Sequence, residues 1–388
     1  MLARRSWLLL QALSYATLAL ASGYLFHRQG LGVFFSDTAQ HLANIDPYIH
    51  GQFFIPHPGF HLTVYYLARV AALTYVTAAA IVLAAAVLAT LVLTQSVIST
   101  PATSTGAQHT INPYTAAAAL SLCLGTAIYV PFFNEYVYLG QFGPGAWHSP
   151  TATLAKPFVL LSFVSFVPLL QASGASPRQY ILGSFCFLAG AFVKPSFAIG
   201  FLPAMALYLV LFHTRVARLY CKVAIWTLPT LALLAYQYHQ TYRGAATGSY
   251  YHDRIVLTNF GVFELYTPSV AVSALLVWAF PVSVVAARPS AIQGPTLRLA
   301  WFTALIAFLQ AGFLAEERNF DEGAFVFGYV IAMFVLYVVS MQEYLGWYRA
   351  DGPVTGKAAR IAVLVVYLAH AVSGTFYFGK MVQGGSFR

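Results

Sequence analysis

The sequence predicts an all-α membrane protein, a polytopic bundle of about eleven transmembrane helices. The chain has 388 residues, of which 59% are hydrophobic and only 8% are charged, with a mean hydropathy of +0.70. A soluble domain would carry about a quarter charged residues. Several apolar runs reach the roughly 20 residues that a helix needs to cross a bilayer. Because these runs do not alternate with polar residues, a transmembrane β-barrel is excluded.

The predicted spans follow one another closely, so we expect a single integral-membrane domain over residues 1–388. The connections between spans are short, and the sequence has no long polar stretch that would form a soluble domain. The segments with a continuous apolar character lie near residues 7–26, 74–97, 113–133, 151–172, 178–193, 196–212, 221–239, 262–286, 298–315, 324–340 and 360–378.

The distribution of the basic residues argues against nucleic-acid binding, and that of the cysteines argues against disulfides and a cysteine metal site. The net charge is +9, but the basic residues are scattered between spans, as in the cytoplasmic loops of membrane proteins. We therefore expect no nucleic-acid partner. Cys123, Cys186 and Cys221 lie far apart in or beside apolar runs, which favours neither a disulfide framework nor a cysteine metal site.

The distribution of lysine and arginine predicts a cytoplasmic N-terminus. Arg4 and Arg5 precede an apolar run too long for a signal peptide, so this run is interpreted as a retained first span. Residues 58–72 are amphipathic and predict a helix at the membrane interface, which leaves 74–97 as the next crossing. Residues 27–73 then form the first non-cytoplasmic loop, and nine of the eleven acidic residues fall on that side.

Ionisable residues gather in this first loop. Five of the eleven histidines lie between residues 27 and 61. If residues 35–48 are helical, Asp37 and His41 share one face, and such a carboxylate can act as a general base. An N-capping aspartate with interfacial histidines is the alternative. The candidate site residues in this loop are Asp37, His41, Asp46, His57 and His61.

A metal site in the same loop is a second hypothesis. Asp37 with His41, and His57 with His61, form two pairs spaced by four residues, a spacing that can present two ligands on one helix face. The sequence contains no His-Glu-x-x-His motif, and we assign no metal ligands. A divalent cation, Mg²⁺ or Mn²⁺, is left open because it would need additional oxygen ligands.

Further candidates follow later spans. Residues 138–151 contain three glycines and two prolines, typical of an ordered turn, and Trp147 and His148 there could contact a sugar. Charged residues at span ends are functional candidates: Lys156 and Lys194 each precede a proline and could hold a phosphate. Arg318 lies in a dense charged segment and could clamp a phosphate. The alternative for Lys156 and Lys194 is that each anchors the chain at the membrane interface. The alternative for the segment of Arg318 is a solvated acidic loop.

The order of these parts resembles the GT-C superfamily of integral-membrane glycosyltransferases. The resemblance rests on Phe35-Ser36-Asp37 after the first span, on His57-Pro58-Gly59-Phe60 before a second juxtamembrane helix, and on the number of spans. The segments 140–158 and 194–197 also look like those of uncharacterised bacterial members. The resemblance implies a GT-C-like fold with juxtamembrane helices in the first non-cytoplasmic loop.

The resemblance also implies an activity. Enzymes of this type transfer a sugar from a polyprenyl-phosphate donor on the non-cytoplasmic face, with an acidic residue of the first outer loop as base. Carried over, Asp37 would deprotonate the hydroxyl of a lipid or glycan acceptor and the transfer would invert the anomeric configuration. Many members have paired acids, whereas here Ser36 precedes Asp37, so Asp46 is a candidate second acid. The expected role is cell-envelope glycan biosynthesis in a bacterial inner or plasma membrane.

A transporter or flippase of a lipid-linked saccharide is the alternative of a different class. Such a protein would place ionisable residues at the middle of its spans, for substrate or protons. Here the centres of most predicted spans carry no charge and the polar residues gather at one face. This pattern favours surface chemistry on a lipid-borne substrate, and therefore an enzyme.

Overall fold

The computed structural model confirms an all-α fold and describes residues 2–100, 113–171, 175–213, 216–242, 253–350 and 356–385. A small two-stranded sheet accompanies the helices, with β1 (Ile255–Leu257) antiparallel to β2 (Leu314–Glu316). The α-helices are α1 (Leu2–Gly30), α2 (Asp37–Ala43), α3 (Ile45–Ile49), α4 (Gly59–Val70), α5 (Tyr75–Ser99), α6 (Pro113–Leu124), α7 (Pro150–Phe166), α8 (Pro177–Val193), α9 (Ser196–Phe212), α10 (Ala217–Tyr242), α11 (Gly261–Glu264), α12 (Val270–Ala287), α13 (Pro295–Phe313), α14 (Val326–Ala350) and α15 (Lys357–Val382). Single 3₁₀ turns are η1 (Val167–Leu170), η2 (Pro289–Gln293) and η3 (Phe320–Glu322).

Each of the eleven apolar segments forms a helix, but eleven crossings are not confirmed. Among the described residues, eight helices are long and apolar enough to span a membrane. The helices α6, α8 and α9 have 12, 17 and 17 residues, fewer than the roughly 20 of a full crossing. The eight long helices make the protein an integral membrane protein.

Two predicted segments have different boundaries in the structure. The segment 113–133 is helical only to Leu124, where Gly374 of the last helix packs against the backbone of Leu124 and Gly125, and the chain beyond is irregular. The segment 262–286 begins its long helix at Val270, since Pro268 disfavours helix before it. Ser269 then caps α12 by accepting a hydrogen bond from the Val272 N–H.

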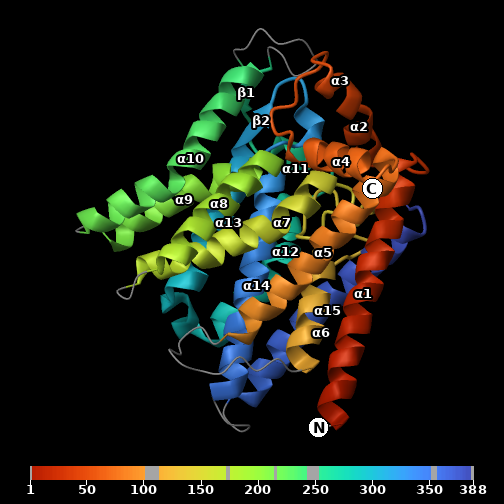
Figure 1. Ribbon diagram of the computed structural model, residues 1–388. Coiled ribbons are helices and arrows are strands. Elements are labelled where there is room, and N and C mark those ends of the chain that lie inside the picture. Colours follow the sequence, from red (N-terminus) through yellow and green to blue (C-terminus); the bar gives the residue numbers. More distant parts are fainter. Residues whose placement is uncertain are drawn as a thin grey trace.

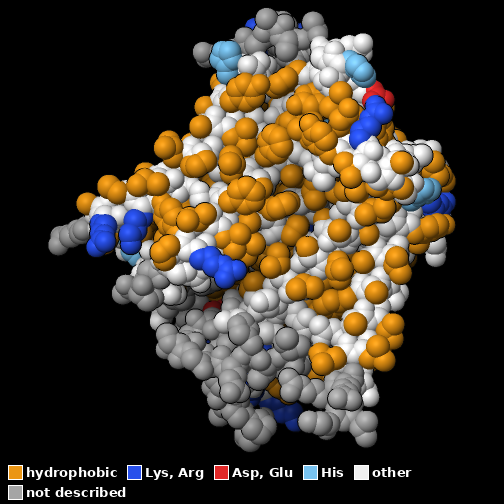
Figure 2. Space-filling view, in the orientation of Figure 1, with side chains coloured by type: hydrophobic (Ala, Val, Ile, Leu, Met, Phe, Trp, Pro, Cys, Tyr) orange, Lys and Arg blue, Asp and Glu red, His pale blue; other side chains and the backbone are white. Residues whose placement is uncertain are grey.

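The short helices α2, α3, α4 and α11 and the β1–β2 sheet gather at one end of the molecule. Figure 1 shows the N-terminus at one end of α1, with α2, α3, α4, α11 and the β1–β2 sheet at the opposite end. The helix α14 is the most buried of the eight long ones. It contacts α5, α7, α9, α12 and α13. Hydrophobic side chains cover most of the surface between the two ends in Figure 2, as expected for a lipid-facing surface.

Residues 138–150 are entirely buried, although they are not helical before α7 begins at Pro150. Gly140 has φ +78° and lies against the carbonyl group of Tyr266, where a side chain would overlap the backbone. Gly143 is in similarly close contact with Thr126 and Ala127. Non-helical backbone inside a membrane protein must be surrounded by protein on all sides. This segment therefore has a fixed position next to α2.

The β1–β2 sheet fixes the loop that follows α13. The Asp253 carboxylate accepts hydrogen bonds from the Arg318 backbone N–H at 3.0 Å and from Asn319 Nδ2 at 3.2 Å. Register pairs join Ile255 with Glu316. The 3₁₀ turn η3 follows directly, so this anchoring determines where Glu322 is placed.

Candidate functional site

Asp37 is the first residue of α2, and a chain of hydrogen bonds holds this helix in place. Thr38 Oγ1 donates to Gln29 Oε1 at 2.7 Å, and Gln29 Nε2 donates to the Trp147 carbonyl at 2.9 Å. Thr38 and Gln29 are fully buried. The helices α1 and α2 and the buried segment 138–150 are therefore joined, which fixes the position of the Asp37 carboxylate.

The surroundings of Asp37 bring the pKa of its carboxyl group close to neutral pH. Burial raises the pKa of Asp37 to about 6, and the Glu322 carboxylate adds to this rise, while the Lys194 ammonium opposes it. Burial disfavours the charged form of a carboxyl group, whereas a nearby cation favours it. The three groups come from the first loop, the α8–α9 junction and the turn before α14, so folding brings them together.

Lys194 is the C-cap residue of α8, and its buried side chain interacts electrostatically with Asp37. Nζ donates to Thr151 Oγ1 at 3.1 Å and lies 3.8 Å from the centroid of the Phe327 ring. Burial lowers the pKa of Lys194 to about 8, against the opposing effects of Asp37 and Glu322. A lysine in this state still carries most of its charge at pH 7.

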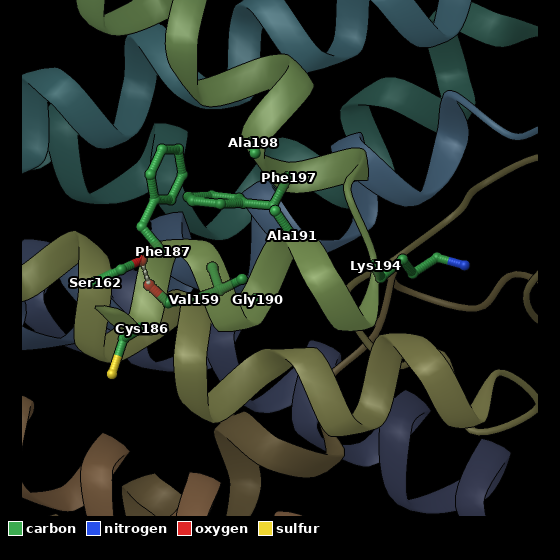
Figure 3. Close-up of a pocket in the computed structure, with 9 residues that line it drawn as sticks. All are labelled: Val159, Ser162, Cys186, Phe187, Gly190, Ala191, Lys194, Phe197 and Ala198. Atoms are coloured by element: carbon green, nitrogen blue, oxygen red, sulfur yellow. Dashed lines mark hydrogen bonds between the residues drawn. The ribbon is translucent and has the colours of Figure 1, made fainter. Parts of the chain in front are cut away.

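The aliphatic part of the Lys194 side chain extends away from an apolar void, so the ammonium lies outside it. Figure 3 shows the side chain pointing away from Phe187, Phe197 and Ala191, which line a void between α7, α8 and α9. This void has no space for a water molecule. The amine thus lies away from this void and donates its hydrogen bond to Thr151 Oγ1.

Three histidines surround the same position. Gly59, at the start of α4, packs so closely on α8 that an added Cβ would lie 2.9 Å from the Phe192 carbonyl oxygen, which places His57 and His61 beside Lys194. His41 Nδ1 and His61 Nε2 are hydrogen-bonded at 3.0 Å. His61 Nδ1 is buried without a protein partner.

Burial keeps these histidines neutral. It lowers the pKa of His57 to about 3 and that of His61 to about 4, and it lowers the pKa of His41 well below its usual range. The Lys194 ammonium adds to the effect on His41 and His57. At pH 7 the imidazoles therefore act as neutral donors and acceptors of hydrogen bonds.

Aromatic side chains form the wall behind Asp37. His148 Nδ1 is hydrogen-bonded to the Tyr377 hydroxyl at 3.3 Å, and the Tyr138 ring stacks on Tyr377 with centroids 5.8 Å apart. The Tyr138 hydroxyl is buried and has no protein partner. Trp147 is buried against Phe378, with ring centroids 4.6 Å apart.

The structure does not bring every predicted residue into this group. Lys156 donates to the Pro144 carbonyl at 2.9 Å and lies 5.1 Å from the Phe334 ring. Phe334 lies two turns beyond Phe327 on α14, so Lys156 is about 10 Å deeper than Lys194. Asp46 accepts a hydrogen bond from the Tyr75 hydroxyl at 2.6 Å, on another part of the surface.

Arg318 is an exposed residue whose backbone N–H binds Asp253. Its segment contributes Glu322 to the group around Asp37 instead. The charge pattern of this segment pointed to Arg318, whereas Glu322, Tyr138, Thr151 and Tyr377 were not predicted as site residues. The dense charge of residues 316–322 was the available signal for Glu322, whereas nothing in the sequence marked Tyr377.

The histidine cluster does not form a metal site in the described part of the chain. No group of three or more His, Cys, Asp or Glu side chains there could hold a metal ion. The hydrogen bond between His41 and His61 engages one ring nitrogen of each imidazole. The described residues therefore offer no complete set of protein ligands for a divalent cation here.

Comparisons with known proteins identify the fold. No protein-family model matches the sequence, and no curated protein matches it. Among solved structures, the chain is similar to the crystal structure of ArnT from Cupriavidus metallidurans bound to undecaprenyl phosphate. The TM-score is 0.55 with 12% identity, over 98% of this chain and 78% of ArnT. The GT-C-like fold that the sequence predicts is therefore confirmed.

Proposed function

We propose that the protein is a membrane glycosyltransferase that moves a sugar from a polyprenyl-phosphate donor to a lipid or glycan acceptor. The observation that carries the proposal is that the Asp37 carboxylate and the buried Lys194 ammonium interact electrostatically. The helix α2, which begins with Asp37, lies at the end of the bundle where α3, α4, α11 and the sheet gather. The fold shared with ArnT, which was crystallised with undecaprenyl phosphate, supports a polyprenyl-phosphate donor.

Asp37 would serve as the general base. Its carboxylate takes the proton of the acceptor hydroxyl while the hydroxyl oxygen attacks the anomeric carbon of the donor sugar. The bond from that carbon to the phosphate oxygen breaks, and the polyprenyl phosphate leaves with the electron pair. Attack opposite the leaving group inverts the anomeric configuration. With a pKa of about 6, Asp37 is mostly ionised at pH 7 and still a useful proton acceptor.

Lys194 would stabilise the phosphate as it leaves. Negative charge grows on the bridging oxygen during bond cleavage, and a fixed cation in a dry site stabilises such charge strongly. The neutral imidazoles of His41, His57 and His61 would donate hydrogen bonds to the phosphate or to sugar hydroxyls. Lys156 lies deeper and already binds a backbone carbonyl, so its proposed role is to support the segment 138–150 rather than to bind donor.

We place this site on the non-cytoplasmic side of the bacterial inner or plasma membrane, with a cytoplasmic N-terminus. The helix α2, which begins with Asp37, lies at the end of the bundle opposite the N-terminus. The cytoplasmic N-terminus that lysine and arginine predict would put this end on the non-cytoplasmic side.

The proposal predicts that Asp37→Asn abolishes sugar transfer. Purified protein would be incubated with a panel of polyprenyl-phosphate sugars and candidate acceptors, and released polyprenyl phosphate would be measured with and without EDTA. We expect release by the wild type and a loss of at least about 100-fold in Asp37→Asn, because a positioned base contributes roughly 10² to 10⁴ in rate. Glu135→Gln, an exposed carboxylate in a later loop, is the matched control and should retain activity.

Two outcomes would contradict the proposal. Transfer by Asp37→Asn at the wild-type rate would remove Asp37 as the base. A stable wild-type protein that releases no polyprenyl phosphate from any donor, but accelerates translocation of a lipid-linked saccharide in vesicles, would establish the flippase alternative.

A further inference from the structure

A surface cavity with a partly polar lining lies at the junction of α4 and α5. The helix α4 ends in a tight reversal: Ala72 has φ +52°, and the Leu73 N–H donates to the Ala68 carbonyl at 2.9 Å, the pattern of a Schellman motif. Thr74 then caps α5 by accepting from the Thr77 N–H. The reversal leaves a surface cavity of about 460 Å³, within the range of small-ligand sites.

The cavity has a cation in its wall and an anion at its rim. Its lining includes Arg69, Thr74 and Tyr75. The Arg69 guanidinium lies 5.3 Å from the centroid of the Tyr65 ring, a contact that holds the side chain in place. At the rim, Asp46 accepts a hydrogen bond from the Tyr75 hydroxyl at 2.6 Å. Tyr75 is thus near both charges, and Arg69 and Asp46 are both exposed.

The surroundings of this cavity are those of a membrane interface. The helix α4 buries Phe60, Val64 and Ala68 and exposes Tyr66 and Arg69. The Tyr65 ring lies 5.3 Å from Tyr66 and 6.4 Å from Tyr75. Tyrosines with basic residues are typical of the headgroup region of a bilayer, and in Figure 2 this end of the molecule borders the broad hydrophobic surface.

We propose that this cavity binds the headgroup of a zwitterionic phospholipid, with its phosphate on Arg69 and its ammonium on Asp46. Arginine pairs with phosphate through two parallel hydrogen bonds. An anionic headgroup without an ammonium would meet the Asp46 carboxylate unpaired, so the two charges together select a headgroup that carries both. The alkyl chains would lie along the exposed face of α4.

This lipid site is separate from the proposed transferase site. Arg69 lies eight residues beyond His61 on α4, about 12 Å along the helix axis. The inference therefore does not depend on the proposed function, and loss of lipid binding can be measured without any sugar donor.

The test is lipid binding to purified, delipidated protein, followed by native mass spectrometry. Phosphatidylethanolamine would be compared with phosphatidylglycerol, which has the phosphate but no ammonium. We expect the wild type to prefer phosphatidylethanolamine, and Arg69→Gln to bind both lipids about tenfold more weakly, as expected for one lost charged contact. Asp46→Asn should abolish the preference while retaining binding of phosphatidylglycerol.

The control is Arg218→Gln, which removes an equally exposed arginine at the start of α10. Arg69→Lys, which keeps the charge without the two parallel hydrogen bonds, should bind at an intermediate level. A monodisperse elution profile establishes folding for each variant. Equal lipid binding by Arg69→Gln and Arg218→Gln would overturn the proposal. Displacement of the lipid by millimolar inorganic phosphate would also overturn it, in favour of a site for free phosphate.

Discussion

At the residue scale, the candidate site combines one buried ammonium, Lys194, with two carboxylates, Asp37 and Glu322. Burial raises the pKa of Asp37 to about 6, while Lys194 lowers it by a smaller amount and Glu322 adds to the rise. Removing either neighbour should change the proton affinity of Asp37 in a direction fixed by the sign of the charge removed.

This arrangement predicts two opposite shifts in the pH profile of sugar transfer. A base must be ionised to act, so wild-type kcat/KM should fall as pH drops through about 6. Glu322→Gln removes a negative neighbour, lowers the pKa of Asp37 and should move this acid limb to lower pH. Lys194→Met removes a positive neighbour, raises the pKa of Asp37 and should move the limb to higher pH, with a larger KM for the donor.

The control for these shifts is Glu317→Gln, an exposed carboxylate of the same segment that does not act on Asp37. Its acid limb should coincide with that of the wild type. If the acid limb moved in the same direction in Glu322→Gln and Lys194→Met, the arrangement would be contradicted. A general loss of structure would lower the rate of both variants, but it would not move their acid limbs in opposite directions.

Asp37 and its histidines could be predicted from the sequence because they are close in the chain. A carboxylate and several imidazoles in one short polar loop of an apolar chain are visible without a structure. Glu322 and Tyr377 reach the same site from near the other end of the chain, through the packing of α14 and α15 on the rest of the bundle. Tertiary contacts of this kind leave no local pattern.

At the element scale, the apolar helices were predictable and their ends were less so. Continuous hydrophobic runs indicate each helix, because the backbone of a span must satisfy its own hydrogen bonds. Composition alone could not predict that α6 ends at Leu124. This end depends on packing, since Gly374 of α15 touches the backbone at Leu124 and Gly125.

The contact between α6 and α15 predicts a strong difference between two glycines of one helix. A Cβ at Gly374 would overlap the carbonyl group of Leu124, whereas a Cβ at Gly379 would have nothing within 4 Å. Gly374→Ala should therefore destabilise the protein by about 1–3 kcal/mol or more. Gly379→Ala should be neutral or stabilising by up to about 1 kcal/mol, because alanine favours helix.

Thermal unfolding in detergent, followed by tryptophan fluorescence, would compare the two variants with the wild type. Equal midpoints for Gly374→Ala and Gly379→Ala would show that α15 does not approach α6 as closely as described.

At the scale of the whole molecule, the fold separates a polar end from a long apolar body. The helices α2, α3, α4 and α11 and the β1–β2 sheet lie at the end opposite the N-terminus. A lipid-borne substrate could enter from the bilayer while its polar head stays at this end, which is consistent with a transferase at the membrane surface. The sequence predicted this polarity through the uneven distribution of basic and acidic residues.

The same polarity predicts which ends of the molecule face the cytoplasm. Gln52, in the exposed loop between α3 and α4, and Lys357, at the start of α15, lie at opposite ends of the bundle. In a Cys221→Ser background, cysteines at these positions would be treated with a membrane-impermeant maleimide in intact cells whose outer barrier is permeable. Gln52→Cys should be labelled directly and Lys357→Cys only after the inner membrane is opened, because loops rich in basic residues stay in the cytoplasm. The reverse pattern would place Asp37 on the cytoplasmic side, where the donor of the proposed reaction would have to be presented from the opposite leaflet.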